Sequence, residues 1–127
     1  MPRQETQGPS RLEEVAEKKV ALKKSLVILA NELRVWENEQ TNDWNVINDN
    51  PEFTKLPTSD RAAEAQQFNA RRAAAFEKKF SKRLANVLRE ARDFGLDTNM
   101  VESTIQDSPG QMLNYVALML SQLADKL

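Results

Sequence analysis

Residues 12–36 read LEEVAEKKVALKKSLVILANELRVW, and apolar side chains recur along this stretch at steps of three and four. The recurring positions are Leu12, Val15, Leu22, Leu26, Leu29, Leu33 and Trp36, and only Lys19 interrupts the series. This spacing places them on one side of an α-helix, and Val20, Val27 and Ile28 widen that apolar side. Because Ser10-Arg11-Leu12-Glu13 has the spacing of a capping box, we expect a helix over residues 10–39.

The composition favours helices and excludes much catalytic chemistry. The 127-residue chain contains three glycines, five prolines, no cysteine and no histidine. So few turn-forming residues argue against a sheet of many strands. Without Cys and His, the chain lacks thiol nucleophiles, the commonest general base and the commonest metal ligands. Because no phosphate-binding loop or nucleophile motif is visible either, we expect a non-enzymatic protein with no cofactor and no bound metal.

The segment QTNDWNVINDNPEFTKLPTS, residues 40–59, has a different character. Asn, Asp, Thr and Pro dominate it, and these residues favour turns over helix interiors. The segment also contains large apolar residues, namely Trp44, Val46, Ile47, Phe53 and Leu56. A disordered linker would rarely carry so many. We expect an ordered loop, with or without a short helical turn, whose apolar residues cover one end of a bundle.

The C-terminal half of the chain predicts three further helices, over residues 59–94, 98–106 and 109–126. Gly95 suits the left-handed position that often follows the last turn of a helix. Ser108-Pro109-Gly110-Gln111 combines a cap residue, a first-turn proline and a glutamine that can return to the cap. This stretch therefore predicts the start of the last helix.

These elements together define the expected fold. Residues 1–9 are polar and broken by proline and glycine, which predicts a flexible tail, and residues 10–127 make one domain. We expect an all-α fold, an antiparallel helical bundle of three long helices plus one short helix, with two of them forming a long hairpin. The last helix is about half as long as the others, so part of the apolar face of the hairpin would stay uncovered.

The sequence also bears on the location of the protein. Neither a secretory signal nor an apolar run long enough to span a membrane is visible. We therefore expect a cytoplasmic protein that binds no membrane.

Aromatic residues are candidates for contact with a partner. Trp36 and Trp44 bracket the predicted end of the first helix, and tryptophan is enriched at the energetic centres of protein interfaces. Together with Tyr115 they are the candidate apolar partner-binding residues. The alternative interpretation is that both tryptophan rings fill the interior at the end of the bundle.

Positive charge is concentrated in one predicted helix. Residues 61–92 carry nine basic and three acidic residues, a net charge of +6. A group of basic residues lies opposite the apolar side of this helix, and its members are Arg71, Lys78, Lys82, Arg89 and Arg92. We call them the basic stripe, which could neutralise phosphates, stay in water, or dock on an acidic surface. Because no aromatic residues interleave with the stripe to stack on bases, we favour the latter two interpretations.

The C-terminal half resembles a known pattern. Residues 76–102, FEKKFSKRLANVLREARDFGLDTNMVE, and residues 108–127, SPGQMLNYVALMLSQLADKL, are similar to small bacterial helical-bundle proteins of unknown function. In that pattern a basic helix with spaced aromatics ends in a Gly-Leu-Asp turn, and a closing helix ends in Leu-Ala-x-x-Leu. The resemblance implies a bacterial or phage-like helical module, and it transfers no functional residues.

Two functions remain open from the sequence. The first is a helical protein–protein interaction module that associates with itself as a homo-oligomer or acts within a larger bacterial or phage assembly. The alternative is an accessory protein that binds nucleic acid through the basic stripe. A membrane-active helix ranks last, because the last helix carries Lys126 as its single cation and interfacial helices usually have a basic polar face.

Overall fold

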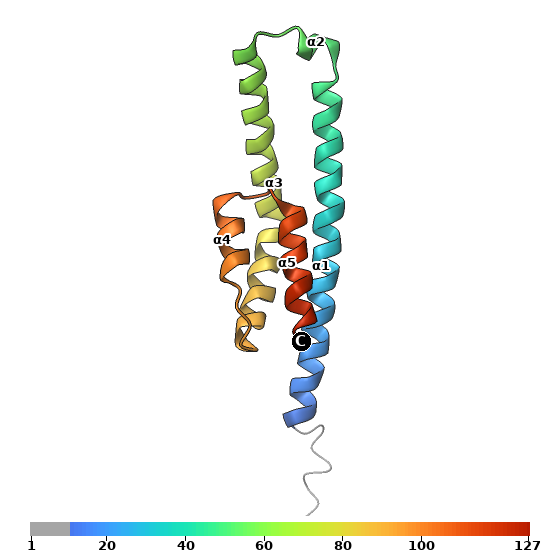
Figure 1. The fold of residues 1–127 in the computed structure, drawn as a ribbon, viewed down its shortest axis with the longest axis vertical. Coiled ribbons are helices and arrows are strands. Elements are labelled where there is room, and N and C mark those ends of the chain that lie inside the picture. The colour runs from blue at the N-terminus through green and yellow to red at the C-terminus, as the bar shows by residue number, and fades with distance from the viewer. Residues whose placement is uncertain (1–10) are drawn as a thin grey trace, which may run out of the picture.

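The computed structural model describes residues 11–127, and this range contains only helices and their connections (Figure 1). Two helices are long, α1 over Arg11–Asn48 and α3 over Thr58–Asp93. Three are short, α2 over Pro51–Thr54, α4 over Asn99–Asp107 and α5 over Leu113–Asp125. The all-α prediction is confirmed, but two helices are long where three were expected. The expected tail and the cap residue Ser10 lie outside the described residues.

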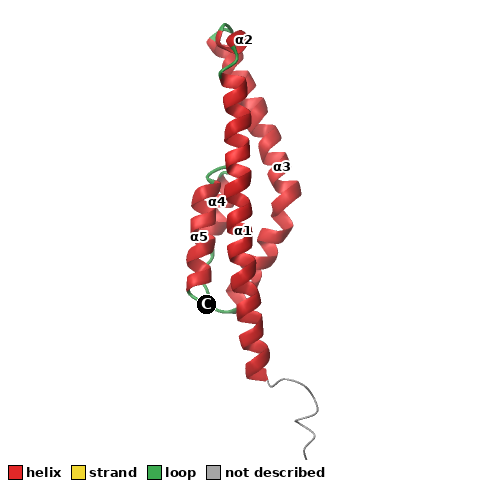
Figure 2. Ribbon diagram, turned by 90° about the vertical axis from the view of Figure 1, so that its right-hand side faces the viewer, coloured by secondary structure: helices red, strands yellow, loops and turns green. Residues whose placement is uncertain are grey.

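The long helices α1 and α3 run in opposite directions and are joined at one end by α2 (Figure 1). Figure 1 and Figure 2 together show that α1, α3 and α5 surround a common interior over the length of α5. The backbones of α1 and α5 approach most closely, because alanines lie buried in both helices: Ala30 in α1, and Ala117 and Ala124 in α5. Side chains this small let two helix axes come close together.

The first helix continues nine residues beyond its predicted end at residue 39, so that boundary was wrong. Trp44 lies 5.7 Å from Phe53 and 5.2 Å from Phe68 between ring centroids, and Ile47 is half-buried. These contacts stabilise the last turns of α1 and outweigh the weak helix propensity of its asparagines. The helix stops before Pro51, where Asn50 is extended and its side chain accepts the N–H of Glu52 at 2.9 Å.

The predicted role of Gly95 at the end of α3 is confirmed. Gly95 has a φ of +82°, in the left-handed region that glycine adopts without steric cost. Its N–H donates to the carbonyl of Arg92 at 2.8 Å, and the N–H of Leu96 donates to the carbonyl of Ala91 at 3.0 Å. Both bonds satisfy carbonyls of the last turn, in the arrangement of a Schellman motif. Half-buried Leu96 then packs against the core.

The last helix begins at Leu113, four residues later than predicted. Gly110 has a φ of +76°, which ends any helix at this point, and a side chain there would place its Cβ 3.0 Å from the Cβ of Phe76. The Ser108-Pro109-Gly110 sequence is therefore a turn that lies close against α3 rather than a helix cap. Met112 is also left-handed, with a φ of 54°, so α5 starts only after it.

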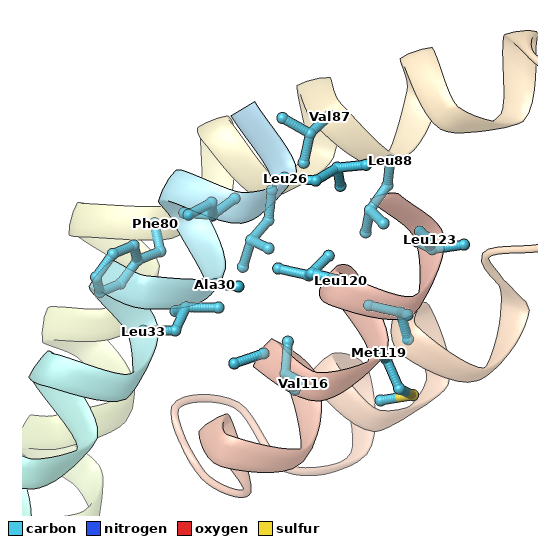
Figure 3. Close-up of a cluster of buried hydrophobic side chains, with 14 of the residues drawn as sticks. Leu26, Ala30, Leu33, Phe80, Val87, Leu88, Val116, Met119, Leu120 and Leu123 are labelled. Atoms are coloured by element: carbon cyan, nitrogen blue, oxygen red, sulfur yellow. The ribbon is translucent and has the colours of Figure 1, made fainter. Parts of the chain in front are cut away.

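Four helices, α1, α3, α4 and α5, contribute to a continuous hydrophobic core, part of which is drawn in Figure 3. Val101 is the buried member from α4. Apolar side chains of α1, α3 and α5 point toward one another in this view, and those labelled are Leu26, Ala30, Leu33, Phe80, Val87, Leu88, Val116, Met119, Leu120 and Leu123. Leu26, Leu33 and Leu120 have no solvent-exposed surface. Burial of this kind stabilises a fold by roughly 25 cal/mol for each Å² of apolar surface removed from water.

The core does not extend along the whole of α1. A 38-residue helix is about 57 Å long and the 13-residue α5 about 20 Å, so α5 covers only part of it. Residues 11–21 are all exposed, and this end of α1 extends past the other helices (Figure 1). Leu12 is 82% exposed and Val15 39%, although both continue the apolar series of the core. Within residues 11–127, no helix has the length and apolar character needed to cross a membrane.

Candidate interaction surfaces

Trp36 lies inside the fold. Its ring is 6% exposed, and its centroid lies 5.7 Å from that of Phe80 in an edge-on arrangement and 6.0 Å from that of Phe76. On another side, the guanidinium carbon of Arg72 lies 5.6 Å from the ring centroid. Trp36 therefore exposes almost no surface to a partner. Its ring packs in the interior, as in the alternative interpretation of the two tryptophans.

Trp44 lies at the end of the hairpin formed by α1 and α3 and is half-buried. Its ring packs against Phe53 of α2 and Phe68 of α3. A shallow groove beside it is lined by Thr41, Trp44, Ala65, Phe68, Asn69 and Arg72. The exposed part of the ring is therefore a surface that a partner could reach, although most of its contacts hold the hairpin end together.

Tyr115 lies on the outer side of α5 and is 40% exposed. Its hydroxyl donates to the sulfur of Met100 at 3.4 Å, which connects α5 to α4. Leu118 of α5 and Met112, which directly precedes α5, are also exposed. Tyr115 and Trp44 therefore lie on different helices. Tyr115 belongs to a separate small apolar area.

One residue of the basic stripe forms an ion pair within the described residues, and the other four do not. Arg92 forms an ion pair with Glu102 of α4, so it holds α4 against the end of α3. The other four residues of the stripe, Arg71, Lys78, Lys82 and Arg89, are exposed, and no ion pair joins them to any residue of the described range 11–127. These four make a ridge along α3, which we call the basic ridge.

Arg72 was not predicted to have a structural role. It lies four residues after Phe68 and four residues before Phe76, and therefore on the apolar side of α3. Its side chain is 11% exposed and pairs with Glu37 of α1, whose side chain is 15% exposed. Its Nε also donates to the carbonyl of Gly110 at 2.5 Å. Its four-residue spacing from half-buried Phe68 and from Phe76 of the core was the signal that could have identified it.

The outer side of α1 carries exposed apolar residues, and three of them, Val20, Val27 and Ile28, were predicted from the sequence to widen the core face. Val35 was not among the predicted residues. The exposed fractions of the four range from 41% for Val27 to 57% for Val35, and the members are Val20, Val27, Ile28 and Val35. We call this set the outer α1 face. The prediction for the first three was wrong because α3 and α5 pack against the other side of α1, where Leu22, Leu26, Leu29 and Leu33 are buried.

Comparison of this chain with protein-family models, with curated proteins and with solved structures finds no match. The resemblance to small bacterial helical-bundle proteins therefore stays a prediction.

Proposed function

We propose that this chain is a non-enzymatic helical interaction module that binds another protein chain through the outer α1 face. The observation that carries the proposal is the apolar character of α1 on two opposite sides. One side is buried against α3 and α5, whereas Val20, Val27, Ile28 and Val35 are exposed on the other. Charged and polar residues separate the two sides, so the exposed set is a second apolar surface and not a continuation of the core.

The spacing of these residues supports a single contact surface. Val20 and Val27 are seven residues apart, as are Ile28 and Val35, and the two pairs are offset by eight residues. Seven residues are close to two turns, so each pair lines up along the helix. The second pair follows the first along the helix and is rotated by about 80° around it. Single exposed apolar residues need no explanation, but a contiguous apolar strip indicates an interaction site.

Affinity capture with matched variants tests the proposal. The bait variant is Ile28→Lys with Val35→Lys, and the control is Gln66→Lys with Gln67→Lys, which adds the same charge at exposed positions of α3. We expect the bait variant to retain about tenfold less partner protein, since truncating a central interface residue costs more than about 1 kcal/mol. The control should retain as much as the original chain, and circular dichroism should show equal helix content.

Equal capture by all three baits from a nuclease-treated lysate would contradict the proposal, as would the absence of any protein retained by the original chain.

A second candidate function is nucleic-acid binding through the basic ridge. Four exposed cations without an ion-pair partner among the described residues favour it. If all four met phosphates of a duplex, the logarithm of affinity would fall with the logarithm of salt with a slope of about −3.6. The test is fluorescence anisotropy with labelled duplex and single strands at low salt. Absence of binding, or no change after Lys78→Glu with Lys82→Glu, would exclude this function.

A further inference from the structure

A short segment of α1 carries a surface whose charges are arranged to match a second copy of itself. A shallow hollow on this helix is lined by Ala16, Glu17, Val20, Ala21 and Lys24. All five residues are exposed, and Val20 alone is 56% exposed. Along the helix axis the order is a carboxylate, two apolar side chains and an ammonium group. We call this set the α1 patch.

The two charges of the α1 patch lie in line. Glu17 and Lys24 are seven residues apart, which is close to two full turns, so their side chains leave the same side of the helix about 10.5 Å apart. Val20 and Ala21 lie midway between them. Neither charge forms an ion pair with any residue in the described range 11–127. Both are therefore available to a partner.

We propose that two copies of the chain pair through the α1 patch, antiparallel, about a two-fold axis between Val20 and Ala21. In this arrangement Glu17 of each copy lies opposite Lys24 of the other, and the apolar centres meet. A two-fold contact uses the same surface on both chains, as a self-complementary patch requires. The inference rests on the proposed function and specifies its partner as a second copy of this chain.

The charges select the antiparallel arrangement. Parallel pairing would place Glu17 beside Glu17 and Lys24 beside Lys24, and both contacts are repulsive. Antiparallel pairing replaces them with two attractive contacts. Exposed ion pairs add little affinity, so the apolar centre supplies the contact and the charges set its direction. The small side chains of Ala16 and Ala21 let the two backbones come close.

Single-cysteine variants test this geometry, because the chain has no cysteine of its own. We expect Val20→Cys to form a disulfide dimer under mild oxidation, since the two sulfur-bearing residues lie beside the axis. Lys24→Cys alone should form none, because its two copies lie too far apart for a disulfide. A mixture of Glu17→Cys and Lys24→Cys should form the mixed dimer. Val46→Cys, which lies on α1 outside the patch and is more exposed than Val20, measures the rate of cross-linking by random collision.

Charge exchange provides a second readout without cysteine. Glu17→Lys and Lys24→Glu should each weaken self-association by roughly tenfold, because each turns two attractive contacts into repulsive ones. The double exchange should restore association, since its charges complement one another again.

The inference is overturned if Val20→Cys cross-links no faster than Val46→Cys, or if Lys24→Cys alone cross-links as well as Val20→Cys, which indicates parallel pairing. It is also overturned if the double exchange stays as weak as the single variants. If the chain binds a different protein, and Ile28→Lys with Val35→Lys abolishes that binding while no self-association occurs, the proposed function survives and the second copy is the wrong partner.

Discussion

At the scale of single residues, Arg72 connects three parts of the molecule. Its guanidinium pairs with Glu37 of α1, its Nε donates to the carbonyl of Gly110 before α5, and it lies over the ring of Trp36. Both members of the ion pair are largely buried, with side-chain exposures of 11% and 15%. Removing one member would leave the other charge poorly solvated and without its partner.

We therefore predict that Arg72→Met lowers the free energy of unfolding by about 2–4 kcal/mol. Arg71→Met, at the exposed neighbouring position, should change it by less than about 0.5 kcal/mol. Urea denaturation followed by circular dichroism measures both values. The double variant Arg72→Met with Glu37→Met should lose less unfolding free energy than the two single variants together. In the double variant neither charge is left buried without its partner. Equal effects of Arg72→Met and Arg71→Met would contradict a structural role for this contact.

The position of Arg72 on the apolar side of α3 could be read from the sequence, but its partner could not. Glu37 is one of three acidic residues in the second half of the predicted first helix, with Glu32 and Glu39. Which of them meets Arg72 depends on how α1 and α3 are aligned. Contacts between residues far apart in the chain set that alignment, and no local pattern reports it.

At the scale of elements, the far end of the α1–α3 hairpin depends on a small aromatic cluster. Trp44, Phe53 and Phe68 are in contact there, and α5 lies further down the hairpin (Figure 1). The first part of α3 is rich in alanine, with Ala62, Ala63, Ala65 and Ala70 among its residues. High helix propensity lets such a segment stay helical with few packing contacts.

We predict that Trp44→Ala opens this end of the hairpin without unfolding the core. Amide hydrogen exchange over residues 40–56 should accelerate roughly 10- to 100-fold, since two aromatic contacts of about 0.5–1.5 kcal/mol each are lost together with buried area. Exchange around Leu26 and Leu120 should remain unchanged. Val46→Ala, which removes an exposed side chain of the same helix, is the control. A uniform acceleration throughout the chain would show instead that the hairpin end and the core unfold together.

Helix boundaries were the part of the fold that sequence patterns predicted least well. Asparagines after residue 39 suggested a loop, yet Trp44 and Ile47 continue the apolar spacing, and Trp44 packs against Phe53 of α2 and Phe68 of α3. Conversely, Pro109 suggested a helix start, yet Gly110 lies so close to Phe76 that the chain turns there first. In both places tertiary contacts overrode local propensity, whereas Gly95 needed only its own backbone freedom and was predicted correctly.

At the scale of the whole molecule, the short α5 covers one side of a much longer hairpin. The apolar residues of α1 were visible in the sequence, but their division into buried and exposed sets was not. That division depends on the side of α1 on which α5 packs, and on α5 ending after 13 residues. Val20, Val27 and Ile28 therefore seemed to belong to the core and instead form much of the outer α1 face.

Sedimentation equilibrium of the purified chain over a range of concentrations tests the central claim most directly. A monomer has a mass of 14.5 kDa. Pairing through the α1 patch predicts an average mass that rises with concentration towards twice this value. It also predicts that Glu17→Lys keeps the mass close to that of the monomer, because this change places like charges opposite one another. A monomer mass at every concentration for the original chain, or the same rise in both proteins, would contradict the claim that the α1 patch binds a second copy.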